Sequence, residues 1–273
     1  MQAASREALA ALRPQVESVL SRFSTSSGLS DLAAELYAVA ALFESQPRLR
    51  RSVADPAAPV EARAGLVRSL IEGKVSASAL SVVTDAVSQR WSSPWDLLDA
   101  IESAADDVLL AAAERDGALD EVEDELFRVE RTLDAQSDLT TLLDEQTASA
   151  ERRQGLLEQI IGGKVNPATL ALLKHAVASR RKRSIVLAID DLIEAASARR
   201  ERSVARVVSA IPLTDQQQNA LAAKLTEVYG RSIDVRWAVD PQIRGGLIVR
   251  VGDEVIDGSV ATRLVQARSS LSG

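Results

Sequence analysis

The chain has 273 residues, a mass of 29.2 kDa and a formal net charge of −7, which leaves room for one large domain or for two to three small ones. An acidic protein repels phosphate groups, so the charge argues against general nucleic-acid binding and favours a protein partner. The sequence has no cysteine, which excludes disulfides and thiolate metal sites. Aromatic residues make up only 3% of the chain, and this scarcity, together with abundant alanine, favours a mostly helical fold.

Residues 1–103 are predicted to form a first bundle of short amphipathic helices. Ser30 is placed to cap one helix, Gly73 to end the helix that follows Pro59, and Ser76 to cap the next one. Between these signals, apolar residues recur at spacings of three and four, which gives each helix one stripe that faces a core.

A second stretch of the chain repeats the first at an offset of 90 residues. The segment RAGLVRSLIEGKVSASALSVVTDAVSQR (63–90) aligns without a gap with RQGLLEQIIGGKVNPATLALLKHAVASR (153–180), with eleven identical positions out of 28. About two identities are expected for ordinary composition. Asn166 followed by Pro167 marks a helix start at the position of the Ser76 cap. Residues 104–200 are therefore predicted to form a second bundle of the same kind.

After about residue 200 the pattern changes from a helical period to strand alternation. Thr214 and Gln217 form a capping box for one helix. Ile233 to Val239 alternates apolar and polar residues, as a half-buried strand does, and a second strand, GLIVRV, follows. Residues 201–273 are predicted to form a small α+β domain of βαββα type, with a last helix that starts at Ser259. The fold class is therefore mostly α, with two tandem short-helix bundles before a small α+β domain.

The segment VGDEVIDGS, at 251–259, holds three carboxylates and two glycines. Gly252 and Asp253 suit a tight hairpin turn, and Asp257 and Gly258 end the returning strand. A calcium loop would need alternating ligands and a closing glutamate about twelve residues in, and a catalytic pair would need one buried carboxylate. The segment is therefore predicted to be structural.

Two other candidates for chemistry are weak. His175 is the only histidine, which excludes metal sites built from several histidines, and its counterpart Asp85 suggests an exposed helix position. The glycine–lysine pair at Lys164 resembles a phosphate-binding loop, but Glu158 and Val165 replace the glycine and the hydroxyl residue that such a loop needs. The sequence therefore predicts no catalytic residue, no metal site and no cofactor.

Two further features have more than one interpretation. The basic run Arg180–Arg183 is typical of a solvated helix face, although a contact with an acidic partner or with lipid headgroups stays open. Trp91 and Trp95 flank Pro94 at a helix junction, where core packing is favoured over ligand stacking.

The C-terminal sequence GGLIVRVGDEVIDGSVATRLVQARSSL (245–271) resembles the signature of the delta subunit of F-type ATP synthases, the counterpart of the mitochondrial oligomycin-sensitivity-conferring protein. The segment before it, at 204–246, is similar to the C-terminal domain of that family, and the second helical unit is similar to its N-terminal six-helix bundle. The resemblance covers about 104–273. The additional unit in front matches the actinobacterial type, whose N-terminal helical domain is duplicated.

The resemblance implies a non-catalytic stator subunit of a hetero-oligomeric membrane complex. In this family the N-terminal bundle accepts an N-terminal helix of an α subunit between its first and fifth helices, and the C-terminal domain holds the peripheral stalk of b subunits. The implied location is peripheral, on the cytoplasmic face of the bacterial plasma membrane. No apolar stretch reaches the roughly 18 to 20 residues that a bilayer span requires.

The resemblance also implies partner-binding residues. The α-binding groove of the second unit would be lined by Val108, Leu109, Ala112, Leu170, Leu173 and Val177. The equivalent groove of the first unit would be lined by Leu9, Leu12, Val16, Leu80, Val83 and Val87. Support for the stalk would come from Leu221, Tyr229 and Leu264. The resemblance further implies that Gly245, Gly246, Gly252, Asp257 and Gly258 are structural. The sequence leaves open which of the two units binds α.

Two other classes of function remain. A general helical-repeat adaptor unrelated to ATP synthase would bind neither α nor b segments. An enzyme that uses the acidic turn would lose an activity on replacement of Asp253 and Asp257 by asparagine, without loss of the fold.

Overall fold

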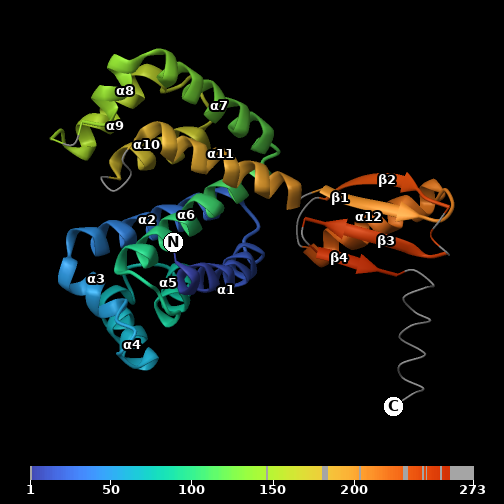
Figure 1. The fold of residues 1–273 in the computed structure, drawn as a ribbon, viewed down its shortest axis with the longest axis horizontal. Helices are drawn as coiled ribbons and strands as arrows, with labels where there is room; N and C mark the ends of the chain where they lie inside the picture. The colour runs from blue at the N-terminus through green and yellow to red at the C-terminus, as the bar shows by residue number, and fades with distance from the viewer. Residues whose placement is uncertain are drawn as a thin grey trace. The chain divides into compact units, whose positions relative to one another are not determined.

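The computed structural model describes residues 2–145, 147–179, 184–202, 204–229, 233–241, 243, 245–252 and 254–258 (Figure 1). In chain order the elements are α1 (Ala3–Leu20), α2 (Ser26–Ser45), α3 (Pro47–Val53), α4 (Val60–Ile71), α5 (Ala77–Ser88), α6 (Pro94–Arg115), α7 (Leu119–Ala135), α8 (Ser137–Leu143), α9 (Ala150–Ile161), α10 (Pro167–Ala178), α11 (Ile185–Arg202), β1 (Val204–Ser209), α12 (Asp215–Tyr229), β2 (Asp234–Val239), β3 (Leu247–Val251) and β4 (Glu254–Asp257). They form two compact units, residues 1–195 and 196–273. The predicted class, helical bundles followed by a small α+β domain, is confirmed.

The duplication in the sequence is a duplication of helices. α3, α4 and α5 recur as α8, α9 and α10, with both ends of each helix shifted by 90 residues. α1, α6 and α11 begin at Ala3, Pro94 and Ile185, at nearly the same interval. We call α1–α6 the first repeat and α6–α11 the second repeat. The two repeats share α6, which closes the first and opens the second.

The shared helix is enclosed from several sides. α6 packs on α1, α2, α3 and α5 of the first repeat and on α7 and α10 of the second. Every residue from Val108 to Ala113 is buried, whereas a helix with a single apolar stripe would expose part of such a run. α6 also continues unbroken through residues 103 and 104, where the sequence places the boundary between two bundles. The division into two bundles stays a prediction, and residues 1–195 form one unit.

Most helix starts follow the predicted local signals. The side chain of Ser76 accepts a hydrogen bond from the Ala79 amide at 3.1 Å, as the cap of α5. The Asn166 side chain caps α10 by accepting from the Ala168 amide at 3.0 Å. Such signals are reliable because a cap involves groups only two or three residues apart.

The predicted cap at Ser30 is wrong. α2 begins four residues earlier, at Ser26, and the side chain of Thr25 accepts from the Gly28 amide at 3.3 Å. Ser30 lies inside the helix, and its hydroxyl donates to the carbonyl of Ser26 at 3.2 Å. Thr25 offers an equally good cap one turn earlier, and the longer helix buries Leu29 completely.

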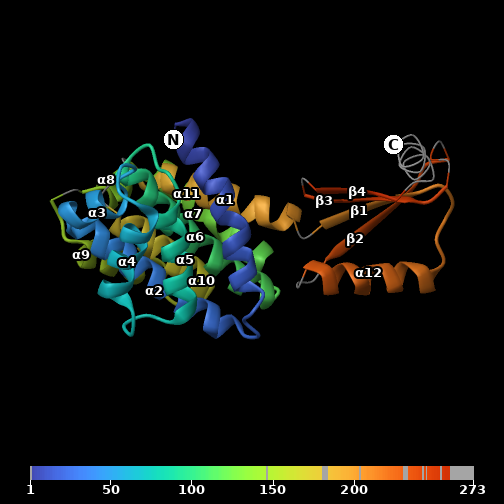
Figure 2. The ribbon, with the colours of Figure 1, turned by 90° about the horizontal axis from the view of Figure 1, so that it is seen from below.

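The C-terminal unit is a four-stranded sheet in the order β2–β1–β3–β4. β1 pairs in parallel with β2, while β3 is antiparallel to both β1 and β4. α12 connects the two parallel strands and covers one face of the sheet (Figure 2). The core on that face is formed by Ala205, Val207, Leu225, Ile233, Val249 and Val251. The predicted capping box is present, since the Thr214 amide donates to the Gln217 side chain at 2.9 Å. The predicted last helix, from Ser259, lies outside the described residues.

Candidate partner-binding surfaces

The structure places the residues predicted for the second-repeat groove mostly in the protein interior. Val108, Leu109 and Ala112 of α6 and Leu173 and Val177 of α10 are buried, and only Leu170 is half-buried. These two helices pack directly on each other. The sequence could assign the residues to an apolar face, but it could not show that neighbouring helices already cover that face.

One of the neighbours is α2 of the first repeat. The ring of Tyr37 stacks on the ring of His175 in α10, with centroids 3.4 Å apart. Its hydroxyl donates a hydrogen bond of 2.5 Å to Asp106 of α6. Burial, and next the adjacent Asp106 carboxylate, raise the pKa of Tyr37 well above its usual value. A single side chain of the first repeat therefore contacts both helices that the resemblance assigns to the α groove.

The corresponding surface of the first repeat has a different chemistry. Leu12, Val16, Val83 and Val87 are buried, whereas Leu9 and Leu80 are half-buried and reach the surface. At an offset of 90 residues, the positions of Asp106 and His175 are held in this repeat by Val16 and Asp85. Burial raises the pKa of the half-buried Asp85. The α1–α5 surface therefore has accessible leucines, and α5 also carries an acidic group.

Sequence reasoning missed the two aromatic residues at equivalent positions of the repeats. Tyr37 of α2 corresponds to Phe127 of α7. Phe127 is 50% exposed, whereas Tyr37 is packed against α6 and α10. The repeat alignment contained this signal, because an aromatic residue stands at the same position in both repeats of a chain that is poor in aromatics.

Residues predicted to support the stalk lie on the inner side of α12. Leu221 and Tyr229 pack against the core of the C-terminal unit, and the Tyr229 hydroxyl donates to Glu254 at 2.8 Å. Leu264 lies outside the described residues. The two described residues can hold α12 on the sheet, but they do not form an outward surface.

The opposite face of the sheet carries a row of cations. In the strand register, Arg206 of β1 lies beside Arg236 of β2 on one side and Arg250 of β3 on the other. All three side chains are exposed, and the nearest ion-pair contact of Arg236 is with Asp234 at 3.9 Å. Like charges directly opposite each other destabilise a sheet, and a bound carboxylate would offset this repulsion. It is a local cationic surface on an acidic protein.

The acidic segment forms the expected hairpin. Val251 pairs with Glu254, so the connection between β3 and β4 has two residues, one of which is Gly252 at φ +55°. Gly245 and Gly246, before β3, both have φ of +83°. The Gly258 amide donates to the Leu247 carbonyl at 2.9 Å. Asp253 lies outside the described residues, and within the described ranges no cluster of three or more His, Asp or Glu residues could hold a metal ion.

The remaining candidates have structural surroundings. Trp91 is buried and donates from its indole nitrogen to the Ala86 carbonyl at 2.7 Å, as predicted for core packing. Trp95 is exposed instead, with the guanidinium of Arg50 at 3.5 Å from its ring centroid. His175 is half-buried against Tyr37, so the prediction of an exposed position is wrong. The basic run Arg180–Arg183 lies outside the described residues.

Comparison with known proteins decides the family. The family model for the ATP synthase delta (OSCP) subunit matches residues 107–271, which is more than half of the chain. The chain belongs to the ATP synthase delta (OSCP) subunit family. The match begins inside α6 and includes the rest of the second repeat and nearly all of the C-terminal unit, in agreement with the resemblance found in the sequence.

Relatives in this family extend the match to the first repeat. ATP synthase subunit delta of Streptomyces griseus subsp. griseus is 41% identical over 273 residues, with complete coverage of both chains. The Corynebacterium diphtheriae subunit delta is 40% identical over 274 residues, again with complete coverage. A chain in the cryo-EM structure of the Toxoplasma gondii mitochondrial ATP synthase hexamer is 28% identical; the match covers 62% of this chain and 95% of that one, with a TM-score of 0.28. Among the described residues of this delta-family chain, no helix has the length and apolarity to cross a membrane.

Proposed function

We propose that this delta-family protein is a non-catalytic stator subunit of a bacterial F-type ATP synthase. It joins the N-terminal helices of α subunits on the catalytic head to the b-type peripheral stalk, and it resists the torque of the rotor. Family membership and the full-length relatives named ATP synthase subunit delta support this assignment. The protein would be peripheral, on the cytoplasmic face of the plasma membrane.

The observation that carries the mechanical part of the proposal is the shared helix. Two bundles joined by a flexible linker would bend under load, because only a few contacts would cross the linker. Here α6 belongs to both repeats and is buried between them. Bending the repeats against each other would require breaking this helix or opening its apolar packing. Residues 1–195 can therefore transmit force as one body.

The first repeat offers the better binding surface for the N-terminal helix of an α subunit. On the α6–α10 side of the second repeat, Tyr37 already contacts both helices. On the α1–α5 side of the first repeat, Leu9 and Leu80 are accessible. An amphipathic helix binds by placing apolar anchors at successive turns on such residues. We assign the α-binding surface to α1 and α5.

The sheet face opposite α12 offers the better binding surface for the peripheral stalk. Leu221 and Tyr229 are directed at the core and support α12 from within. The arginine row of Arg206, Arg236 and Arg250 is exposed on the other face. Complementary charge of this kind steers association and fixes the register of a partner. We assign it to acidic residues of a b-type helix, with Leu264 as a further predicted support.

A pair of equivalent residues tests the α assignment. Leu80 and Leu170 occupy the same position in the two repeats and are both half-buried. We expect Leu80→Asp to weaken binding of an α N-terminal peptide by about tenfold or more, because a charge replaces an apolar anchor. In reconstituted ATP synthase it should leave ATP hydrolysis intact and abolish proton pumping. Leu170→Asp is the matched control and should keep both activities.

The opposite result, uncoupling by Leu170→Asp alone, would move the α site to the second repeat. Full coupling in both variants would reject an α groove of this type altogether. Leu173 and Val177 are unsuitable for this test, because they are buried and an aspartate there would unfold the chain. Circular dichroism checks that each variant is folded.

The alternatives make different predictions. A general adaptor would bind neither an α peptide nor a b fragment, even as the unmodified full chain. An enzyme that uses the acidic turn would show turnover of a small molecule that Asp257→Asn abolishes. The stator proposal expects binding to both fragments and no such turnover.

A further inference from the structure

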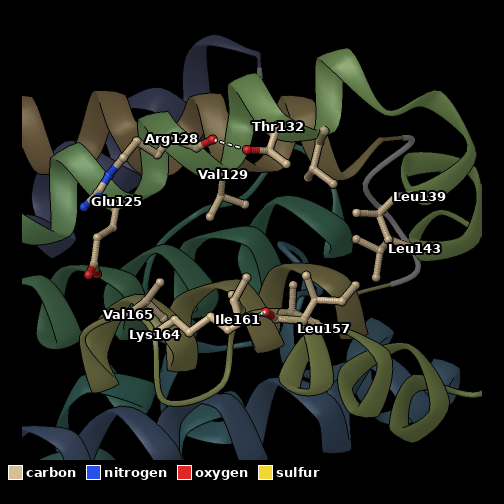
Figure 3. A pocket seen from close by; sticks show the side chains of 12 residues that line it. Glu125, Arg128, Val129, Thr132, Leu139, Leu143, Leu157, Ile161, Lys164 and Val165 are labelled. Carbon is tan, nitrogen blue, oxygen red and sulfur yellow. Dashed lines mark hydrogen bonds between the residues drawn. The ribbon is translucent and has the colours of Figure 1, made fainter.

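The second repeat contains an apolar cavity that belongs to neither proposed surface. It has a volume of about 150 Å3 and is lined by residues of α7, α8 and α9 and of the turn after α9. Figure 3 shows Leu139 and Leu143 at one end of it and Glu125 and Arg128 at the other. The cavity is therefore a slot with one apolar end and one polar end.

Equivalent positions in the first repeat are closed. Val39 and Ile71 are each 3% exposed, in α2 and α4. Their counterparts Val129 and Ile161, in α7 and α9, line the cavity and are half-buried. The residue types are identical in the two repeats, so the residues alone do not explain the opening. Their neighbours must differ.

One residue of the lining, and a residue hydrogen-bonded to it, become smaller in the second repeat. Phe43, which is 1% exposed in the first repeat, corresponds to Leu133. Arg50, which is buried and donates to the Phe43 carbonyl at 3.1 Å, corresponds to Thr140. The Thr140 hydroxyl donates to the Leu133 carbonyl at 2.7 Å, so it keeps that hydrogen bond without the long side chain. The hydrogen bond persists while a phenyl ring and a guanidinium group are missing from the second repeat.

The polar end of the slot has a cationic rim. Arg128 Nε donates to the Asp124 carbonyl at 3.3 Å, and Lys164 Nζ donates to the Ile160 carbonyl at 2.8 Å. These backbone acceptors do not neutralise the two charges. The one acid of the lining, Glu125, is engaged elsewhere: its carboxylate accepts from the Asn166 amide at 2.8 Å and from the Thr169 hydroxyl at 2.6 Å. In the first repeat, Ala38 stands at the position of Arg128.

We infer that this slot, between α7 and α9, is a second docking site, and that it takes one large apolar side chain of an acidic amphipathic helix from a partner protein. The apolar side chain, a leucine or a phenylalanine, fills the cavity. Carboxylates on the same helix pair with Arg128 and Lys164. The site goes beyond the proposed contacts with α and b, because it uses neither α1 and α5 nor the sheet.

The size of the cavity favours a side chain over a small molecule or a lipid. Binding sites for small molecules usually measure about 300–1,000 Å3. An apolar protein cavity of about 150 Å3 holds a group the size of benzene. One phenyl ring or one isobutyl group of a helix fits this volume, and the rest of the helix would lie across α7 and α9. The rim charges select acidic flanks, since like charges would cost binding energy.

The test uses the purified full chain and two synthetic helical peptides of about 18 residues, or five turns. Both peptides carry leucine along one face and one central phenylalanine; one has glutamates on its flanks and its twin has lysines. Binding is measured by fluorescence anisotropy at low and high salt. We expect the glutamate peptide to bind and the lysine twin to bind at least about tenfold more weakly, with the difference shrinking at high salt.

Variants that restore first-repeat residues identify the site. Leu133→Phe fills the cavity and should weaken binding of the glutamate peptide by about tenfold or more. Arg128→Ala removes one rim charge and should weaken binding of the same peptide by about two- to fivefold. Arg131→Ala, an exposed cation of the same helix outside the slot, is the matched control and should have no effect. Val129→Phe closes the mouth instead and replaces Leu133→Phe if that variant does not fold.

Three results would overturn the inference. One is the absence of glutamate-peptide binding, a second is binding that both cavity-filling variants leave unchanged, and a third is equal binding of the lysine twin. Laurate and anionic phosphatidylglycerol vesicles are measured in parallel, and competition by either for the same slot would show that the occupant is a lipid and would reject a helix. None of these measurements involves Leu80 or proton pumping, so failure here is distinguishable from failure of the proposed function.

Discussion

Tyr37 in the first repeat and His175 in the second stack face to face, with ring centroids 3.4 Å apart. The same tyrosine donates a hydrogen bond to Asp106 of the helix that the repeats share. The interface between the repeats therefore includes a phenol that is held in its neutral, donating form.

We expect replacement of this tyrosine to change how folding stability depends on pH in the alkaline range. Burial and the Asp106 carboxylate raise the pKa of Tyr37. Its contribution to folding is therefore fully present below the unfolded pKa of about 10, and it is lost as the pH rises towards the folded value. The slope can reach about 1.4 kcal/mol per pH unit. Urea unfolding between pH 9 and 11 should show a smaller pH dependence for Tyr37→Phe than for the unmodified chain.

At neutral pH the same variant should lose about 1 to 2 kcal/mol of unfolding free energy, because Asp106 loses a charged hydrogen bond. Equal slopes for the two proteins above pH 9 would show that the tyrosine does not ionise differently in the folded state.

A glutamate holds α7 to the start of α10 in the second repeat. Glu125 is buried and accepts hydrogen bonds from the Asn166 amide and the Thr169 hydroxyl. Its counterpart Glu35 accepts from the Ser76 amide at 3.0 Å, the equivalent contact, and from the Ser76 hydroxyl at 2.5 Å, but it is more exposed. We expect Glu125→Ala to cost about 2 to 3 kcal/mol, because buried partners are left unsatisfied, and Glu35→Ala to cost about 1 kcal/mol. Denaturant midpoints measure both, and a larger loss for Glu35→Ala would contradict this ranking.

Replacement by alanine should change the unfolding free energy in opposite directions at two glycines, one inside α4 and one just after it. Gly65 lies exposed inside the helix, and an added Cβ would meet no atom within 4 Å. Gly65→Ala should therefore stabilise the chain by about 0.5 to 1 kcal/mol. Gly73 has equally open space but φ of +75°, so Gly73→Ala should destabilise it by about 1 to 2 kcal/mol. Thermal unfolding of the two variants is the measurement, and a shared sign would contradict the backbone explanation.

A pair of carboxyl groups connects α7 and α11. A hydrogen bond with Asp190, and next burial, raise the pKa of Glu130. A raised pKa means that the folded state holds this proton more tightly than the unfolded chain does. The contribution of the protonated Glu130 to folding stability is therefore present below the unfolded pKa near 4.5 and is lost at higher pH. Glu130→Gln should thus raise stability at pH 7 and have little effect near pH 4. In an Asp190→Asn background, Glu130→Gln should no longer raise stability at pH 7. An unchanged gain in stability would show that a neighbour other than Asp190 raises the pKa of Glu130.

The arginine row predicts a salt-sensitive contact with the stalk. Arg206 lies at its centre, between Arg236 and Arg250. We expect Arg206→Glu to weaken binding of a b-subunit fragment by at least about tenfold at low salt, because it reverses a charge between two others. High salt should reduce the difference. The exposed Lys224 of α12, on the other face, supplies the control Lys224→Glu, and an equal loss there would argue for a nonspecific charge effect.

Much of the fold could be predicted from the sequence because its signals are local. The caps at Ser76 and Asn166 and the alternation in β2 each depend on residues a few positions apart. The 90-residue repeat shows that the same local signals occur twice in the chain. The failure at Ser30 has the same origin, since Thr25 offered a competing cap within one turn. The residues of the candidate groove were also assigned correctly to apolar helix faces, as the burial of Leu173 and Val177 shows.

The sequence by itself determined the periodic pattern, and with it the helices, the duplication and the family of this chain. Only the tertiary structure decided what each apolar face touches: that the repeats share α6, that Tyr37 contacts both α6 and α10, and that the slot beside Val129 is open where Val39 is closed. The physical reason is that capping and periodicity act between near neighbours along the chain. The exposure of a face depends on the size and placement of side chains from distant segments, which no local pattern encodes.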